Sequence, residues 1–158
     1  MIWTRGQKVS LQVLEDQDIF ARAGIMRALA DGVSRNFNPP DSVKLDTLAR
    51  TDWYVIRETG LEVGVLGIQR DLPERGTATA RFLAVDPQYR GKAVGTRAVL
   101  IAERKLRSEG YELFGRVPET NGRGLYFWLR CGFVGQRSNS ESESATWFRR
   151  IPRGKYND

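Results

Sequence analysis

The 158-residue chain has no histidine, a single cysteine and no long apolar run. The absence of imidazole excludes a histidine general base, a serine-histidine nucleophile and most transition-metal sites. One cysteine, Cys131, excludes an internal disulfide and a cysteine metal cluster, and we interpret it as a small packed residue. The sequence therefore predicts no metal site.

Membrane insertion is not predicted either. No stretch approaches the roughly 20 consecutive apolar residues that span a bilayer, and residues 1–8 lack the apolar middle of a signal peptide. We expect a cytoplasmic protein with no membrane partner. The length, with 41% hydrophobic and 10% aromatic residues, is typical of one globular domain, here residues 1–158. For the oligomeric state, we expect a monomer or a homodimer.

The chain is basic, with 25 Lys and Arg against 19 Asp and Glu and a net charge of +6. A basic surface attracts anions, although net charge by itself describes association and solubility, not activity. Clusters at 123–130 and 149–155 could contact nucleic acid. The alternative for both is a solvated face and tail.

Hydrophobic periodicity predicts an α/β fold with one mixed, mostly antiparallel sheet flanked by helices. Strands are expected at 9–14, 53–56, 61–68, 77–85, 111–117, 133–137 and 145–151, with 53–56 and 61–68 joined as a hairpin across 58–60. Helices are expected at about 16–32, 41–49, 93–110 and 121–132.

The segment from Val85 to Thr96 joins a strand end, a proline turn and a helix start. Pro87 has no amide proton and stops the strand, while the glycines at 91 and 95 leave room between backbone amides and a ligand. The helix that begins near Ala93 directs its unpaired amides and positive dipole end to the same place. A diphosphate would fit there.

The helix that follows is predicted to bury one face and to stop at Gly110. That face carries Val94, Ala98, Ile101, Ala102 and Leu106, whereas Glu103 and three arginines fall mostly elsewhere. A second helix is capped by Asn121, has Leu125, Trp128 and Leu129 on one side, and ends at Gly132.

Two segments together carry a family resemblance. Arg90-Gly-Lys-Ala-Val-Gly95 after Val85-Asp-Pro87, and Asn121, Trp128 and Gly132-Phe133, resemble the motifs of the GNAT acyltransferase superfamily. In this region the chain is similar to bacterial N-acetyltransferases of the ribosomal-protein type. The resemblance implies that the parallel strands of 79–85 and 111–117 splay apart, and that acetyl-CoA or another acyl-CoA is the acyl donor.

The resemblance also implies roles for particular residues. The backbone of Leu83, Ala84 and Val85 would bind the pantetheine arm, and the Val85 amide would stabilise the oxyanion. The loop for the diphosphate would be formed by Arg90, Gly91, Lys92, Ala93, Val94, Gly95 and Thr96. Asn121 and Trp128 would contact the cofactor arm.

The chain departs from the family pattern at two positions. Trp128 stands where many relatives have a tyrosine that protonates the leaving sulfur, and an indole is too weak an acid, so packing or stacking is the alternative role. Arg116 stands where such relatives have a glutamate base. Glu119 is the candidate base, although solvent-facing surface charge is the more common role for carboxylates such as Glu119 and Glu112.

These departures bear on the acceptor. A lysine amine of pKa about 10.4 is about one part in 2,500 neutral at pH 7, whereas an α-amino group of pKa about 7.7 to 8.0 is about a tenth to a sixth neutral and needs less help from a base. Arg116 favours an acceptor with a carboxylate or phosphate. The alternative is that Arg116 is a solvent-facing charge on a sheet edge.

The first interpretation is an N-acetyltransferase that acts on a small-molecule amine or a protein N-terminus. One alternative is a noncatalytic acyl-CoA-binding regulatory module, with Trp128 and Arg116 marking lost chemistry. Another is an acyltransferase that acts on nucleic acid or aminoacyl-tRNA.

Overall fold

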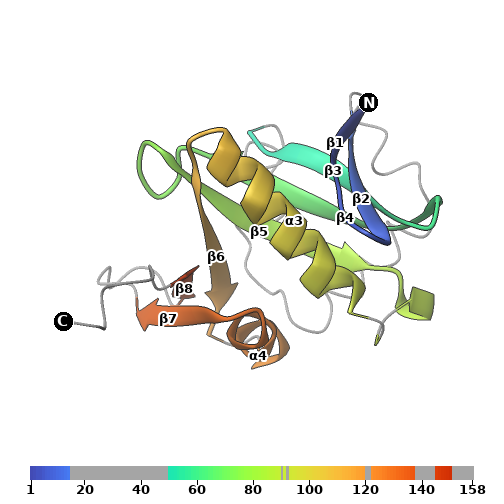
Figure 1. The fold of residues 1–158 in the computed structure, drawn as a ribbon. Helices are drawn as coiled ribbons and strands as arrows, with labels where there is room; N and C mark the ends of the chain where they lie inside the picture. Colours follow the sequence, from blue (N-terminus) through green and yellow to red (C-terminus); the bar gives the residue numbers. More distant parts are fainter. Residues whose placement is uncertain (15–49, 90, 92, 120–121, 138–144, 151–158) are drawn as a thin grey trace.

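A computed structural model describes residues 1–14, 50–89, 91, 93–119, 122–137 and 145–150. Within these ranges, eight strands form one sheet in the order β1-β2-β3-β4-β5-β6-β8-β7 (Figure 1). Their bounds are β1 Ile2–Arg5, β2 Val9–Val13, β3 Asp52–Glu58, β4 Leu61–Arg70, β5 Thr77–Val85, β6 Glu112–Pro118, β7 Phe133–Arg137 and β8 Ala145–Arg150. The predicted helices at 16–32 and 41–49 lie outside the described residues.

The sheet is mixed, and every neighbouring pair is antiparallel except β5 and β6. This pairing confirms the predicted fold class. The β3–β4 hairpin is also confirmed, and its turn residues Thr59 and Gly60 both have positive φ, 47° and 86°. Such a turn matches the right-handed twist of the strands that it joins. Strand β1 was not predicted, because four residues gain strand structure only by pairing with β2.

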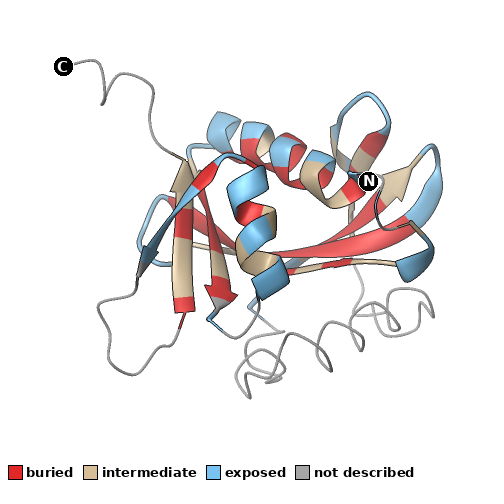
Figure 2. Cartoon of the chain, turned by 90° about the horizontal axis from the view of Figure 1, so that it is seen from below, coloured by how far each residue is buried: buried red, intermediate tan, exposed pale blue. Residues whose placement is uncertain are grey.

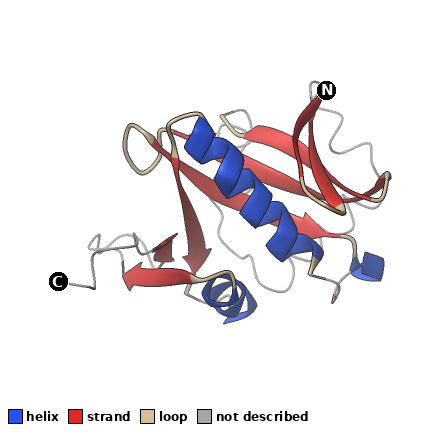
Figure 3. Ribbon diagram, in the orientation of Figure 1, coloured by secondary structure: helices blue, strands red, loops and turns tan. Residues whose placement is uncertain are grey.

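Two helices, α3 (Val94–Ser108) and α4 (Gly122–Arg130), lie on the same side of the sheet (Figures 2 and 3). The predicted buried stripe of α3 is confirmed, since each of its five members is at most 7% exposed. Gly110, at φ 91°, follows the end of α3 as predicted.

Two expectations about side chains were wrong. Glu103 is buried, because Arg150 from β8 donates to its carboxylate at 2.7 Å and compensates the charge. Leu129 is 55% exposed, since α4 turns Trp128 and not Leu129 toward the sheet. Arg116, for which the alternative was a charge on a sheet edge, lies on β6 opposite Trp147 of β8 and one residue beyond the last pair with β5.

Strand β5 is paired differently on its two sides. On the β4 side the pairing continues to Gly64 opposite Val85, whereas on the β6 side it ends at Ala80 opposite Gly115. The β4 register shifts so that Phe82 lies opposite Gly67 and Ala80 opposite Ile68, which leaves Arg81 as an extra residue in β5. A bulge of this kind bends the strand that carries it. Strands β5 and β6 therefore diverge beyond the bulge (Figure 1), which confirms the predicted splay.

Candidate functional site

The turn after β5 is held by its own backbone and by Asp86. The Asp86 carboxylate accepts a hydrogen bond from the Gln88 amide at 3.0 Å, and the Asp86 carbonyl accepts one from the Tyr89 amide at 2.8 Å. This closes the short 3-10 helix η3 (Pro87–Tyr89). Gly91 then adopts φ 85°, in the left-handed region that favours glycine, so the chain can reverse toward α3.

Helix α3 begins without a side-chain cap. Its N-cap residue, Ala93, has φ 61° and a methyl side chain that cannot accept a hydrogen bond. The Arg97 amide donates to the Ala93 carbonyl at 3.0 Å, so the amides of Val94, Gly95 and Thr96 precede this bond at the start of the helix. A left-handed residue followed by helical ones forms a concave set of amides that suits an anion. Amides arranged in this way could hold a diphosphate group.

The end of β5 presents backbone to the opened side of the sheet. The Asp86 amide donates to the Val63 carbonyl at 2.7 Å, toward β4. Successive residues of a strand direct their amides to opposite edges, so the Val85 amide points away from β4, and so does that of Leu83. That edge is the one from which β6 has diverged. Ala84 is buried on the sheet face opposite the one that carries Leu83 and Val85.

The chain also matches the sequence model of a known family. A sequence model of the Acetyltransferase (GNAT) family matches residues 22–133, which is more than half of the chain. The chain belongs to the GNAT acetyltransferase family. No curated protein sequence matches it.

Solved structures share the GNAT fold with this chain at low sequence identity. An acetyltransferase from Salmonella typhimurium that modifies the N-terminal serine of the 50S ribosomal protein L7/L12 aligns with a TM-score of 0.71 and 11% identity, over 96% of this chain and 99% of that one. An acetyltransferase from Thermus thermophilus aligns at 0.68 and 20% identity, over 91% and 97%. A Bacillus subtilis acetyltransferase in complex with CoA aligns at 0.64 and 16% identity, over 92% and 100%.

Within this GNAT chain, Gly95 lies where the start of α3 approaches α4. A β-carbon on Gly95 would lie 3.3 Å from the Phe127 ring and 3.7 Å from the Leu83 side chain. An added methyl would therefore be tight, and larger side chains would displace Phe127 or Leu83. The loop residues Arg90 and Lys92 and the motif residue Asn121 lie outside the described residues.

Trp128 is a core residue of this GNAT chain. It is 4% exposed, and its ring centroid lies 4.9 Å from that of Phe133 and 6.4 Å from that of Phe148. The indole packs directly on Gly115, where any β-carbon would overlap it. This burial supports the packing role, and its contact with the cofactor arm stays a prediction.

Cys131 is confirmed as a packed residue, at 6% exposed. Burial raises the pKa of its thiol, and a hydrogen bond with Thr96 partly opposes the rise. A raised pKa means less thiolate at neutral pH, which does not suit a nucleophile.

The three charged candidate residues have different surroundings in the structure. Arg116 is half-buried on β6, with its guanidinium carbon 5.9 Å from the centroid of the Trp147 ring. Glu112 accepts two hydrogen bonds from Arg149, at 3.1 and 2.9 Å. Glu119 is exposed in the turn after β6. Of the two carboxylates, Glu112 is thus engaged in an ion pair, which leaves Glu119 as the candidate base.

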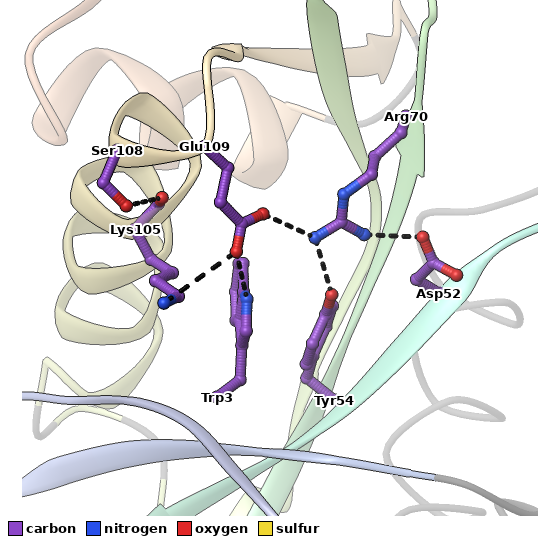
Figure 4. A network of polar contacts seen from close by, with 7 residues as sticks. All are labelled: Trp3, Asp52, Tyr54, Arg70, Lys105, Ser108 and Glu109. Carbon is purple, nitrogen blue, oxygen red and sulfur yellow. Dashed lines mark hydrogen bonds and ion pairs between the residues drawn. The ribbon is translucent and has the colours of Figure 1, made fainter.

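Sequence reasoning missed Arg81, which the bulge places at the point where β5 leaves β6. No pattern in the sequence marks a bulge at this position. Sequence reasoning also missed the cluster around Arg70 at the other end of α3, because its members are far apart along the chain (Figure 4).

Among the described residues, no helix is long and apolar enough to cross a membrane. Over the same ranges, no group of three or more His, Cys, Asp or Glu side chains is placed to hold a metal ion.

Proposed function

We propose that the protein transfers an acetyl or other short acyl group from acyl-CoA to an α-amino or other weakly basic nitrogen on an anionic acceptor. The observation that carries the proposal is the divergence of β5 and β6 beyond Ala80 and Gly115. After the diverging part of β5, the chain reaches the uncapped start of α3. An opened strand edge can pair with the amides of a pantetheine arm, and the helix start can hold the diphosphate at its end.

The reaction is direct transfer. The acceptor nitrogen attacks the thioester carbonyl, a carbon–nitrogen bond forms, and the carbon–sulfur bond breaks as CoA leaves. The Val85 amide, directed to the opened edge, is the donor to the oxyanion that forms in between. This role needs no particular side chain, only the backbone geometry.

Two protons must be moved during this reaction. The acceptor nitrogen loses one, for which Glu119 is the candidate base in the described part of the chain. An α-amino group needs less assistance than a lysine amine, because about a tenth to a sixth of it is already neutral at pH 7. The leaving sulfur gains one. Trp128 does not supply it, since its indole is buried and is not an acid.

The acceptor is anionic in this proposal because Arg116 lies on β6 just beyond the last parallel pair. A guanidinium there can hold a carboxylate or phosphate by two parallel hydrogen bonds and repels a protonated lysine. Small molecules and protein N-termini both remain candidates. Cytoplasmic location and one domain over 1–158 stay predictions.

The experiment is thiol release from acetyl-CoA with a panel of neutral and anionic amines. We expect release with α-amino acceptors that carry an anionic group, and a loss in kcat/KM for these acceptors in Arg116→Ala of about 1.5 to 3 kcal/mol, the value of a hydrogen bond to a charged group. Neutral amines and acetyl-CoA affinity should change little. An equal loss for all acceptors, or none, would refute the role of Arg116.

The same panel tests the alternatives. Tight CoA binding in calorimetry without thiol release for any amine would favour the noncatalytic module. Salt-dependent RNA binding, together with thiol release from acetyl-CoA when an aminoacyl-tRNA is the acceptor, would favour the nucleic-acid alternative.

A further inference from the structure

Arg150, the last residue of β8, joins α3 to the end of α4. Its Nε donates to the Glu103 carboxylate of α3 at 2.7 Å. Its Nη2 donates to the carbonyl of Cys131, the residue after α4, at 3.1 Å. The guanidinium carbon also lies 4.6 Å from the centroid of the Phe133 ring. One rigid fork of donors therefore binds two helices that are separate along the chain.

Glu103 makes this link a buried one. The residue is 8% exposed, and glutamate is rarely buried to this degree without a partner for its charge. Arg107 also approaches the carboxylate, at 3.6 Å, but its side chain is 69% exposed, so water screens the attraction. Arg150 is therefore the main partner that compensates the charge of Glu103.

The end of α4 that Arg150 binds also contacts the first turn of α3. The Cys131 thiol is hydrogen-bonded with the Thr96 side chain. One turn earlier in α4, the Phe127 carbonyl accepts a hydrogen bond from the Cys131 amide at 3.0 Å. The Phe127 ring lies 3.3 Å from the place of a β-carbon on Gly95. Gly95 and Thr96 carry two of the amides at the start of α3 that suit a diphosphate.

These contacts meet α3 at two points on one face. Thr96 and Glu103 are seven residues apart, about two turns of a helix, so their side chains lie on the same side. Cys131 contacts the first of them and Arg150 the second, and Arg150 also binds Cys131. We call Thr96, Glu103, Cys131 and Arg150 the α3–α4 clamp. A shift of α4 along α3 would have to break one of its contacts.

We propose that Arg150 is a positioning residue for CoA. By binding Glu103 and the Cys131 carbonyl together, it holds the end of α4 against the first turn of α3 and sets the arrangement of the amides there. Donors that are already in place bind an anion more tightly, because binding then carries no cost of ordering them. This inference rests on the proposed placement of the diphosphate, and Arg150 acts through Cys131, Thr96 and Phe127.

The first test compares Arg150→Met with Arg149→Met. Arg150→Met removes both donors, so calorimetry should show CoA binding weakened about tenfold or more. The KM for acetyl-CoA should rise by a similar factor while kcat changes less than about twofold, because the chemical step uses the Val85 amide and not the clamp. Arg149, the preceding residue of β8, binds Glu112 instead, so Arg149→Met should change CoA affinity less than about twofold.

A double variant separates positioning from stability. Arg150→Met leaves the buried Glu103 without its main partner and should lower the midpoint of denaturant unfolding. Adding Glu103→Leu removes the uncompensated charge and should recover much of that midpoint, but the link to the Cys131 carbonyl stays broken. CoA affinity should therefore stay about tenfold weaker in the double variant. Recovery of CoA affinity together with stability would overturn the proposal, as would unchanged affinity in folded Arg150→Met.

Arg150→Lys tests the same point if Arg150→Met folds poorly. It retains a positive charge for Glu103 without the fork of donors, and CoA affinity should fall between those of wild type and the double variant. Wild-type affinity in Arg150→Lys would show that charge compensation is the whole role of Arg150.

Amide resonances of Gly95 and Thr96 in CoA-free protein separate this inference from the proposed function. Nuclear magnetic resonance should show both shifted in the double variant and unmoved in Arg149→Met. If wild-type protein binds no CoA yet these resonances shift in the double variant, the placement of the diphosphate is wrong and the clamp stands. If wild type and the double variant bind CoA equally well, the positioning role is wrong and the proposed function stands.

Discussion

The two ends of α3 are built in opposite ways. At the C-terminal end, Arg70 of β4 donates to Asp52 at 2.6 Å, to the Tyr54 hydroxyl at 2.9 Å and to Glu109 at 3.2 Å (Figure 4). Glu109 also accepts a hydrogen bond from the Trp3 indole at 3.0 Å. At the N-terminal end, Ala93 offers no side-chain acceptor to the first amides of the helix.

The Arg70 cluster also stacks its rings. The guanidinium carbon lies 5.6 Å from the centroids of Trp3 and Tyr111, and the rings of Trp3 and Tyr54 stack with centroids 4.2 Å apart. Burial lowers the pKa of Arg70, but hydrogen bonds with Tyr54, Asp52 and Glu109 outweigh it and raise the pKa overall. Its partners come from β1, β3 and the residues after α3, so the cluster ties three distant segments together.

The difference shows how one helix can be anchored at one end while the other end, in the proposed function, binds an anion. Side chains that satisfy one another leave nothing for a ligand, and they hold the helix in place. Backbone amides without a side-chain cap are poised to bind an anion, at a cost in stability of roughly 0.5 to 2 kcal/mol relative to a capped helix. We call the part of α3 near Arg70 and Glu109 the rigid end, and the part that begins at Ala93 the open end. In the proposed function, the contacts of the rigid end hold α3 in place and the open end binds the ligand.

The largest effect is expected from a substitution that disrupts the open end. Gly95→Val should weaken CoA binding by about a hundredfold or more, equivalent to about 2.7 kcal/mol, because its branched side chain meets Phe127 and Leu83 and shifts the helix start. Calorimetry with CoA measures the loss, and thermal unfolding shows whether the fold remains. Gly95→Ala is the control, with a methyl 3.3 Å from Phe127 and a smaller loss. Unchanged CoA affinity in a folded Gly95→Val protein would refute the placement of the diphosphate.

Disrupting the rigid end should lower the stability of the fold and leave CoA affinity nearly unchanged. Arg70→Met should lower the free energy of unfolding by about 2 to 3 kcal/mol, because it leaves Asp52, Tyr54 and Glu109 without their shared donor. CoA affinity should stay within about twofold. Denaturant unfolding checks the first and calorimetry the second, with Arg75→Met, at an exposed turn, expected to change stability by less than about 0.5 kcal/mol. A loss of CoA affinity to match the loss of stability would show that the two ends are coupled.

Trp128 lies beneath the point where the strands part, and its replacement sharpens the distinction between packing and catalysis. Trp128→Phe should lower stability by about 1 to 2 kcal/mol, because a smaller ring leaves space above Gly115, and should keep substantial turnover. Unfolding curves and kcat with saturating acetyl-CoA measure the two effects. Lost turnover with stability and CoA binding intact would assign the indole a direct role.

The smallest effect concerns pH at the rigid end. Burial raises the pKa of Tyr54 above its ordinary value of 10.0, with Arg70 acting in the opposite direction. The folded state thus holds this proton more tightly, and the associated stability is present below about pH 10 and is lost as pH rises through the folded pKa. Tyr54→Phe should flatten this decline and cost about 1 kcal/mol at pH 7. Unfolding series from about pH 8 to about pH 11 test it, and identical slopes in both proteins would contradict it.

Much of the fold could be predicted from the sequence because its signals are local. The strand 77–85 was predicted with the bounds that β5 has, since Gly76 precedes it and Pro87 follows its end. The buried stripe of α3 follows from helical spacing, and Gly110 and Gly132 have the positive φ expected after each helix. Of the site, the loop around Gly91 and the helix start near Ala93 were predictable for the same reason.

The missed features depend on contacts between distant segments. Helical spacing put Glu103 outside the buried stripe, but an arginine 47 residues later compensates its charge and allows burial. Trp128 and Leu129 are adjacent and both apolar, and only the space above Gly115 decides which of them is buried.

By itself, the sequence determined the succession of elements from β3 to β8 along the chain, the family, and the glycine-containing helix start of α3, because glycine, proline and apolar spacing act over a few residues. Tertiary structure alone decided that Arg81 and Arg116 each follow the last parallel pair of β5 and β6, since that needs the pairing to end at Ala80 and Gly115. It also decided which charges are engaged: Glu112 by Arg149, Glu103 by Arg150, and Glu109 and Asp52 by Arg70. Charged side chains pair across the folded structure and not along the chain. These ion pairs therefore could not be predicted before the strands were placed.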